Sequence, residues 1–198
     1  MNYEPFTLGK KFRIVPPDTP PIEGRTDIVV ARGAFGSGEH ETTASCIEIM
    51  ESLDLTGKTF LDLGSGTGIL AIAAIKLGAS SGLCVDIEAD AVDSGRQNCA
   101  LNGIDTEIRH CCGTLDDVAD QEFDFALANI YGDILLAVCD DLVANIKPGG
   151  TLLLSGILWE YNFDVRQRYE QAGCEIIRNR MMDEFSTVLL KKRIYISS

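Results

Sequence analysis

After residue 58, the spacing of apolar residues along the chain alternates between two patterns. Runs of consecutive apolar residues, typical of strands buried on both faces, are separated by stretches with an apolar residue every three or four positions, typical of helices. Strands are expected at Thr59–Leu63, Gly82–Ile87, Glu107–Cys112, Phe123–Ile130, Thr151–Leu158, Glu175–Arg180 and Thr187–Arg193. Helices are expected at Ile69–Leu77, Ala89–Leu101, Ile134–Ile146 and Asn162–Ala172. An earlier helix is expected where apolar residues recur every three positions from Ala44, and it should end near Gly57.

The order of these elements predicts the fold class. Alternating strands and helices favour a doubly wound α/β domain with a mostly parallel sheet. The last two strands are joined by too few residues for a helical crossover, so they must form an antiparallel hairpin. A seven-stranded, mostly parallel sheet that ends in such a hairpin resembles the Rossmann-like class I methyltransferases. This resemblance implies S-adenosyl-L-methionine as the cofactor.

The first thirty residues have a different composition from the rest. They contain five of the six prolines, which remove amide donors and disfavour helix at the preceding residue. We therefore expect an extended arm or linker at residues 1–30 and the methyltransferase domain at residues 31–198. The N-terminus has no apolar signal core, and no apolar run reaches the roughly 18–20 residues that span a bilayer. A cytoplasmic protein without membrane contact is expected.

The charge of the chain restricts its partners. With 17 basic and 30 acidic residues the formal net charge is −13, which disfavours general nucleic-acid binding. An acidic surface suits a basic protein segment or an amine, although the same charge could serve solubility alone. The seven cysteines include no Cys-x-x-Cys spacing, so we expect neither a disulfide framework nor a metal site.

A glycine loop supplies the sharpest chemical signal. Gly64-Ser65-Gly66-Thr67-Gly68 directly follows a strand and precedes a helix, so a ligand can approach its backbone and the helix amides. The Gly-x-Gly-x-Gly spacing is one residue tighter than the dinucleotide-binding fingerprint. Asp86 ends the next strand, 22 residues after Gly64, where a carboxylate can accept both hydroxyls of a ribose. The alternative role of Asp86 is to cap the following helix.

Two further segments supply candidate residues. The fourth strand ends at Asn129, whose side-chain oxygen could orient the lone pair of a neutral amine towards the methyl group; the alternative is an Asx turn. A second glycine-rich loop, Gly33–Gly38, precedes the first helix. Its Phe35 could pack against a ligand, and Thr43 could either hydrogen-bond a ligand or cap the helix.

These segments resemble the PrmA family, the bacterial methyltransferases of the eleventh large-subunit ribosomal protein. The similarity covers roughly residues 28–193 and lies in Ala34–Thr43, Gly64–Ala74, Val85–Ile87, Ala128–Ile130 and Leu154–Leu158. The resemblance implies cofactor contact by Thr43, Gly64, Asp86 and Asn129, with Asn129 as the catalytic residue between cofactor and target amine. The expected cofactor-binding residues from these motifs are Phe35, Thr43, Gly64, Gly66, Asp86, Ile87 and Asn129.

The chain departs from that family in two places. Members have an N-terminal docking domain for the ribosomal protein, and the residues before the first glycine loop are too few for it, so we expect it to be lacking. Tyr131 stands where members have a small or aliphatic residue. The expected activity is N-methylation of protein lysine or terminal amino groups, a ribosomal protein among the candidates. Alternatives are a small-molecule amine methyltransferase, a nicotinamide-dependent oxidoreductase and a non-catalytic cofactor-binding module.

Overall fold

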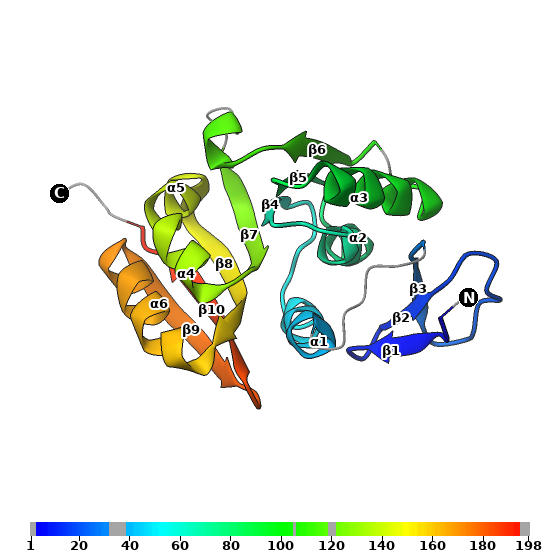
Figure 1. Ribbon diagram of the computed structural model, residues 1–198, viewed down its shortest axis with the longest axis horizontal. Helices are drawn as coiled ribbons and strands as arrows, with labels where there is room; N and C mark the ends of the chain where they lie inside the picture. Colours follow the sequence, from blue (N-terminus) through cyan, green and yellow to red (C-terminus); the bar gives the residue numbers. More distant parts are fainter. Residues whose placement is uncertain (1–2, 32–38, 105, 119–121, 195–198) are drawn as a thin grey trace.

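The centre of the molecule is a seven-stranded sheet, seen in a computed structural model that describes residues 3–31, 39–104, 106–118 and 122–194 (Figure 1). The strand order is β6-β5-β4-β7-β8-β10-β9, and all neighbours are parallel except the two pairs that include β10. This order confirms the doubly wound sheet with its antiparallel hairpin. The strands are β4 Thr59–Leu63, β5 Ser81–Asp86, β6 Ile108–Cys112, β7 Phe123–Asn129, β8 Ile146–Leu158, β9 Cys174–Met181 and β10 Phe185–Lys192.

Helices cover both faces of the sheet. Helices α1–α3 lie on one face and α4–α6 on the other (Figure 1), and each face has its own cluster of buried apolar side chains. The helices are α1 Glu39–Met50, α2 Ile69–Lys76, α3 Ala89–Leu101, α4 Gly132–Ala137, α5 Cys139–Ala144 and α6 Trp159–Gln171, with a short 3-10 helix, η1, at Leu115–Asp117. In the described part of the chain no helix is both long and apolar enough to cross a membrane.

Three short strands precede the main sheet, at β1 Phe6–Leu8, β2 Phe12–Val15 and β3 Thr26–Val29. β2 pairs antiparallel with β1 and parallel with β3, and this small sheet lies beside α1, α2 and α3 (Figure 1). The sequence predicts an extended arm over residues 1–30, whereas the structure has three strands there. The difference arises because Pro5 precedes β1 and the other four prolines lie between β2 and β3, so that Phe12, Ile14 and Ile28 can enter the same core as α1 and α2.

Several other boundaries differ from expectation, among them the following three. Helix α1 ends at Met50, not near Gly57, because the chain leaves the helix through tight turns in which Ser52 N–H donates to Ile49 O. The single helix expected at Ile134–Ile146 is two helices that meet at Val138. Strand β8 begins at Ile146 rather than Thr151, and its register against β7 shifts within this added segment.

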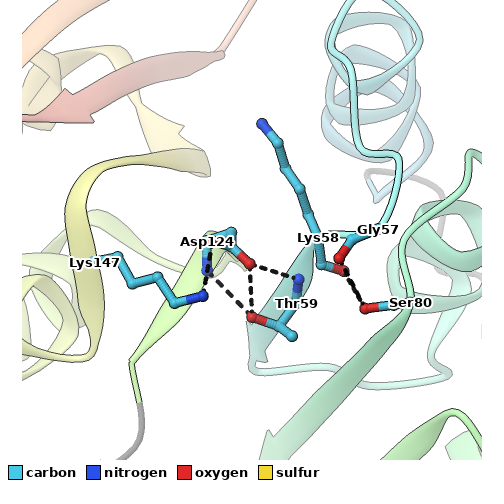
Figure 2. Close-up of polar contacts among 6 residues, drawn as sticks. All are labelled: Gly57, Lys58, Thr59, Ser80, Asp124 and Lys147. Carbon is cyan, nitrogen blue, oxygen red and sulfur yellow. Dashed lines mark hydrogen bonds and ion pairs between the residues drawn. The ribbon is translucent and has the colours of Figure 1, made fainter.

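A polar cluster joins the amino ends of β4 and β7. The Asp124 carboxylate accepts hydrogen bonds from Thr59 N at 2.9 Å and Thr59 Oγ1 at 3.0 Å, and from Lys147 Nζ at 2.9 Å (Figure 2). Partial burial opposes ionisation of Asp124, but Lys147 and the Thr59 hydrogen bonds outweigh it and lower its pKa. The Lys58 side chain points away from this cluster in Figure 2. The cluster fixes two strands whose opposite ends belong to the candidate site.

Candidate active site

The register of the parallel strands brings three sequence motifs to one edge of the sheet. Leu63, the last residue of β4, lies opposite Val85 of β5 and Ala128 of β7. Gly64, Asp86 and Asn129 each stand one residue beyond these positions. The structure therefore places the glycine loop, the acidic residue and the strand tip side by side at the carboxyl edge, where doubly wound sheets bind ligands.

The glycine loop is hydrogen-bonded to the end of β5 on one side and has open space at Gly66 on the other. Gly64 and Gly66 have φ of 69° and 52°, a left-handed backbone that favours glycine. The Gly64 and Ser65 amides donate to Val85 O at 2.8 and 3.2 Å, which draws the loop over the end of β5. A side chain at Gly66 would meet no heavy atom within 4 Å, so this part of the loop can receive a ligand.

Asp86 supports the loop and still has acceptor sites. Its Oδ2 accepts from Gly66 N at 2.8 Å, and its Oδ1 accepts from Glu88 N at 3.1 Å. A carboxylate has about four acceptor sites, so two remain for ligand hydroxyls. Glu88, rather than Asp86, is the N-cap residue of α3, and its side chain makes no capping bond. The neighbouring Ile87 side chain is 69% exposed, an apolar surface beside the carboxylate that suits an adenine ring.

A second carboxyl group, that of Asp62, is buried beneath the loop. Asp62 is hydrogen-bonded to the Ala71 amide in the first turn of α2, and its Oδ2 has no partner among the described residues. Burial, and then the nearby Asp86 charge, raise the Asp62 pKa to about 7, against the lowering effect of the Ala71 bond. A ligand with positive charge above the loop would favour the ionised form of this group.

Asn129 is connected to α1 and to the glycine loop. Its Nδ2 donates to Thr43 Oγ1 at 3.4 Å, and no described residue donates to its Oδ1. Thr43 is the fifth residue of α1, so it does not cap this helix. A Cβ atom built on Gly64 would lie 2.3 Å from Ile130 Cγ2, so Ile130 packs directly on the loop. The structure thus brings together all the expected cofactor-binding residues except Phe35, which lies outside the described residues.

Sequence reasoning missed two buried polar residues that support this site. Ser155 lies opposite Asn129 in the sheet, and its Oγ is 2.7 Å from Thr187 Oγ1. Asn98 donates to Thr67 O in the glycine loop at 2.9 Å. A signal for Asn98 was present in the sequence, because it interrupts the apolar stripe of α3 with an uncharged polar residue. Ser155 lies within Leu154–Leu158, one of the segments that carry the family resemblance, but no role for it was expected from the sequence.

The surface beyond Asn129 is aromatic and acidic. Tyr131 and Trp159 are both 64% exposed. Tyr161 packs against the backbone of Gly132, and Trp159 N donates to Glu184 O at 3.0 Å, so the first turns of α4 and α6 and the β9–β10 turn are adjacent. Exposed acidic residues on these three segments are Asp133, Glu160, Asp183 and Glu184. Such a surface can attract a cationic group to the strand tip.

Comparisons with known proteins agree on one family. A family model described as "Ribosomal protein L11 methyltransferase (PrmA)" matches residues 1–193. A curated ribosomal protein L11 methyltransferase of Exiguobacterium sp. is 35% identical over 193 residues, which are 96% of this chain and 62% of the relative. The chain therefore spans about three fifths of that relative's length.

One solved structure belongs to the same grouping, and a second shares the fold. The crystal structure of a ribosomal protein L11 methylase from Lactobacillus delbrueckii subsp. bulgaricus has 29% identity and a TM-score of 0.88, and the match covers 98% of this chain and 100% of that one. An RNA methyltransferase from Salinibacter ruber in complex with S-adenosyl-L-homocysteine has 16% identity and a TM-score of 0.60, covering 77% of this chain and 94% of that one. The second likeness concerns the fold alone.

Proposed function

Because the chain belongs to the ribosomal protein L11 methyltransferase (PrmA) family, we propose that it is an S-adenosyl-L-methionine-dependent N-methyltransferase of protein lysine or terminal amino groups. In this proposal the catalytic domain is residues 31–198, with strands β1–β3 packed on it. The substrate is a basic protein segment, with ribosomal protein L11 as the first candidate. Localisation to the cytoplasm follows from such a substrate.

The single observation that best supports the proposal is the open glycine loop between Asp86 and Asn129. The residues present fit the cofactor. Gly66 leaves room above the loop, Asp86 keeps acceptor sites for ribose hydroxyls, and Ile87 exposes an apolar surface beside them. Asp62 adds a carboxyl group beneath the loop, with one oxygen that has no partner in the part of the chain that the structure describes. When bound, S-adenosyl-L-methionine supplies an electrophilic methyl group.

In this proposal Asn129 orients the amine rather than removing its proton. An amine attacks through its lone pair, so it must be neutral, whereas a free lysine has a pKa of about 10.4. Desolvation at the edge of the sheet disfavours the ammonium form. The Thr43 contact uses the Asn129 amide nitrogen, which leaves Oδ1 to accept from an amine N–H and to aim its lone pair. Water then takes the released proton.

The acidic and aromatic surface beyond Asn129 supports a cationic substrate. Tyr131 and Trp159 are exposed beside acidic residues, and residues 129–146 contain no lysine or arginine. A protonated lysine side chain can approach such a surface before it loses its proton at the strand tip. The same surface could receive a small amine, which is the second candidate substrate.

The test is methyl transfer by the purified chain. We would incubate it with S-adenosyl-L-methionine carrying a labelled methyl group and, separately, with ribosomal protein L11 and with small primary amines. Mass spectrometry of intact protein and peptides should locate methyl groups on L11 amines. Label on the small amines alone would contradict the protein-substrate proposal. Failure to bind S-adenosyl-L-methionine in calorimetry, together with binding of a nicotinamide dinucleotide, would contradict the methyltransferase proposal itself.

The Asp86→Ala variant is the matched test of the cofactor site. It removes the acceptor for ribose hydroxyls and the bond to Gly66 N, so cofactor binding should be lost. Asp93→Ala is the control, because Asp93 is an exposed residue of α3 that forms an ion pair with the exposed Arg96. Micromolar affinity retained by Asp86→Ala would contradict the ribose assignment.

A further inference from the structure

Asn98 of α3 is a buried polar side chain that joins two distant segments. It has 0% exposure. Its Nδ2 donates to Thr67 O in the glycine loop at 2.9 Å, and its Oδ1 accepts from Ala31 N, just beyond β3, at 2.8 Å. Both the donor and the acceptor of this amide are therefore used. A buried amide with both functions satisfied fixes the geometry of its partners, since breaking either bond leaves a polar group unpaired.

Asn102, one turn further along α3, makes a related but separate contact. Its Oδ1 accepts from Val29 N at 3.0 Å and its Nδ2 donates to Val29 O at 2.7 Å, as a neighbouring strand would. Its Nδ2 also lies 2.8 Å from Asn98 O. Asn102 thus attaches β3 to α3 without contacting the glycine loop. Of these two asparagines, Asn98 is the one that contacts Thr67 in the glycine loop.

The Thr67–Gly68 peptide is fixed at both of its polar atoms. Asn98 holds Thr67 O, and Gly68 N donates to Ser65 O at 2.8 Å. On one side of this peptide is Gly66, whose amide Asp86 holds, and on the other is the start of α2. The orientation of this peptide plane therefore determines the position of the open part of the loop, at Gly66, relative to the Asp86 carboxylate.

We propose that Asn98 is a positioning residue for the cofactor: it holds the glycine loop in its binding shape and couples that shape to its own contact with the Ala31 amide, which Asn102 does not make. The inference rests on the proposed function, since it presumes that the loop receives S-adenosyl-L-methionine. Occupation of the loop stabilises the Asn98–Ala31 contact, and the Asn98–Ala31 contact stabilises the occupied loop.

Asn98→Asp tests the coupling with little change of shape. The aspartate keeps an acceptor for Ala31 N but loses the N–H donor to Thr67 O. When ionised, it places a carboxylate oxygen against that carbonyl; when protonated, it can donate again. The hydrogen-bond partners of Asn98 are uncharged, so the new carboxyl group is the added titratable group at this position. Asp62 beneath the loop, whose pKa is raised to about 7, and His110, which packs on Gly95 one turn earlier in α3, are present in every chain, so each variant is compared with the unmodified chain at the same pH.

The measurement is the Kd for S-adenosyl-L-homocysteine by calorimetry, between pH 6 and pH 8.5. We expect Asn98→Asp to weaken binding about tenfold at the upper pH, the effect of one lost hydrogen bond, and to recover towards the unmodified value at the lower pH. The control Asn102→Asp loses its donors to Val29 O and Asn98 O and should bind within about twofold of the unmodified chain at every pH.

A second measurement needs no variant. Hydrogen exchange of the unmodified chain should slow at residues 29–31 when S-adenosyl-L-homocysteine is added, although these residues are far from the loop in sequence. Unchanged exchange there, equal affinity of Asn98→Asp and the unmodified chain across the pH range, or an equal loss in Asn102→Asp would each overturn the coupling. Absence of binding by the unmodified chain would instead overturn the proposed function, and the inference with it.

Discussion

Substitution of Gly64 by alanine should destabilise the fold through Ile130. Gly64 has φ of 69°, and an L-residue in that conformation costs about 1–2 kcal/mol. The added Cβ would also lie 2.3 Å from Ile130 Cγ2, a methyl group of a β-branched side chain whose χ1 rotamers are restricted. Forced overpacking adds about 1–3 kcal/mol. The free energy of unfolding should therefore fall by about 2–5 kcal/mol.

Gly66→Ala is the matched control for backbone strain. Gly66 has φ of 52°, but its Cβ would meet no heavy atom within 4 Å, so only the conformational cost of about 1–2 kcal/mol applies. The new methyl group would instead occupy the open side of the loop. We therefore expect Gly66→Ala to be milder than Gly64→Ala in stability and to weaken cofactor binding.

A double-mutant cycle in urea unfolding isolates the steric contribution. Ile130→Ala removes Cγ2 and leaves Cβ as the nearest atom, at 3.8 Å from the Gly64 Cβ position, an ordinary contact. In that background Gly64→Ala should cost no more than Gly66→Ala, giving a coupling of about 1–3 kcal/mol. Equal costs of Gly64→Ala in the two backgrounds would refute the reasoning, because the clash with Ile130 would then contribute nothing.

Three further predictions concern single side chains. Asn129→Ala should retain cofactor affinity in calorimetry but lower kcat about 100-fold, the scale of lost orientation; unchanged turnover would remove its role. Asp124→Asn should cost about 1 kcal/mol or less at pH 7, and the difference should disappear as pH falls through the lowered pKa of Asp124, which urea unfolding at several pH values would measure. The Asp62 pKa is raised to about 7, so the folded state keeps that proton as pH rises from about 4, and the free energy of unfolding declines towards pH 7. Asp62→Asn should reduce this decline. An identical pH profile of the free energy of unfolding in the variant would contradict the assignment.

The central sheet could be predicted because its strands are buried on both faces. Thr59–Leu63 and Ala89–Leu101 have the bounds expected from sequence, since a continuous apolar run and a Gly-terminated amphipathic stretch are local signals. That Gly64, Asp86 and Asn129 meet could be predicted from topology, because the carboxyl ends of parallel strands meet at one edge, whereas cofactor contact by Thr43 was implied by the family resemblance. The break at Val138 was not predictable in this way, since neither glycine nor proline marks it.

Strands β1–β3 escaped prediction because their stability is tertiary. Each has three or four residues, and the surrounding prolines suggested an extended arm. Their apolar side chains are buried only because α1 and α2 cover them. The contacts of Asn98 escaped prediction for the same reason: its place in the apolar stripe of α3 marks it as polar and buried, but its partners are 67 and 31 residues away.

The attachment of β3 to α3 bears on how the chain folds during synthesis. Val29 and Ala31 leave the ribosome long before Asn102 and Asn98, which are 73 and 67 residues later. Until that helix emerges, Val29 N and Ala31 N lack their asparagine acceptors, and the apolar residues of β3 have no complete core to enter. Long-range closure of this kind is slow and exposes strand edges to aggregation. Strand β3 is thus synthesised well before the helix that completes its native contacts, and its folding has to wait for that helix.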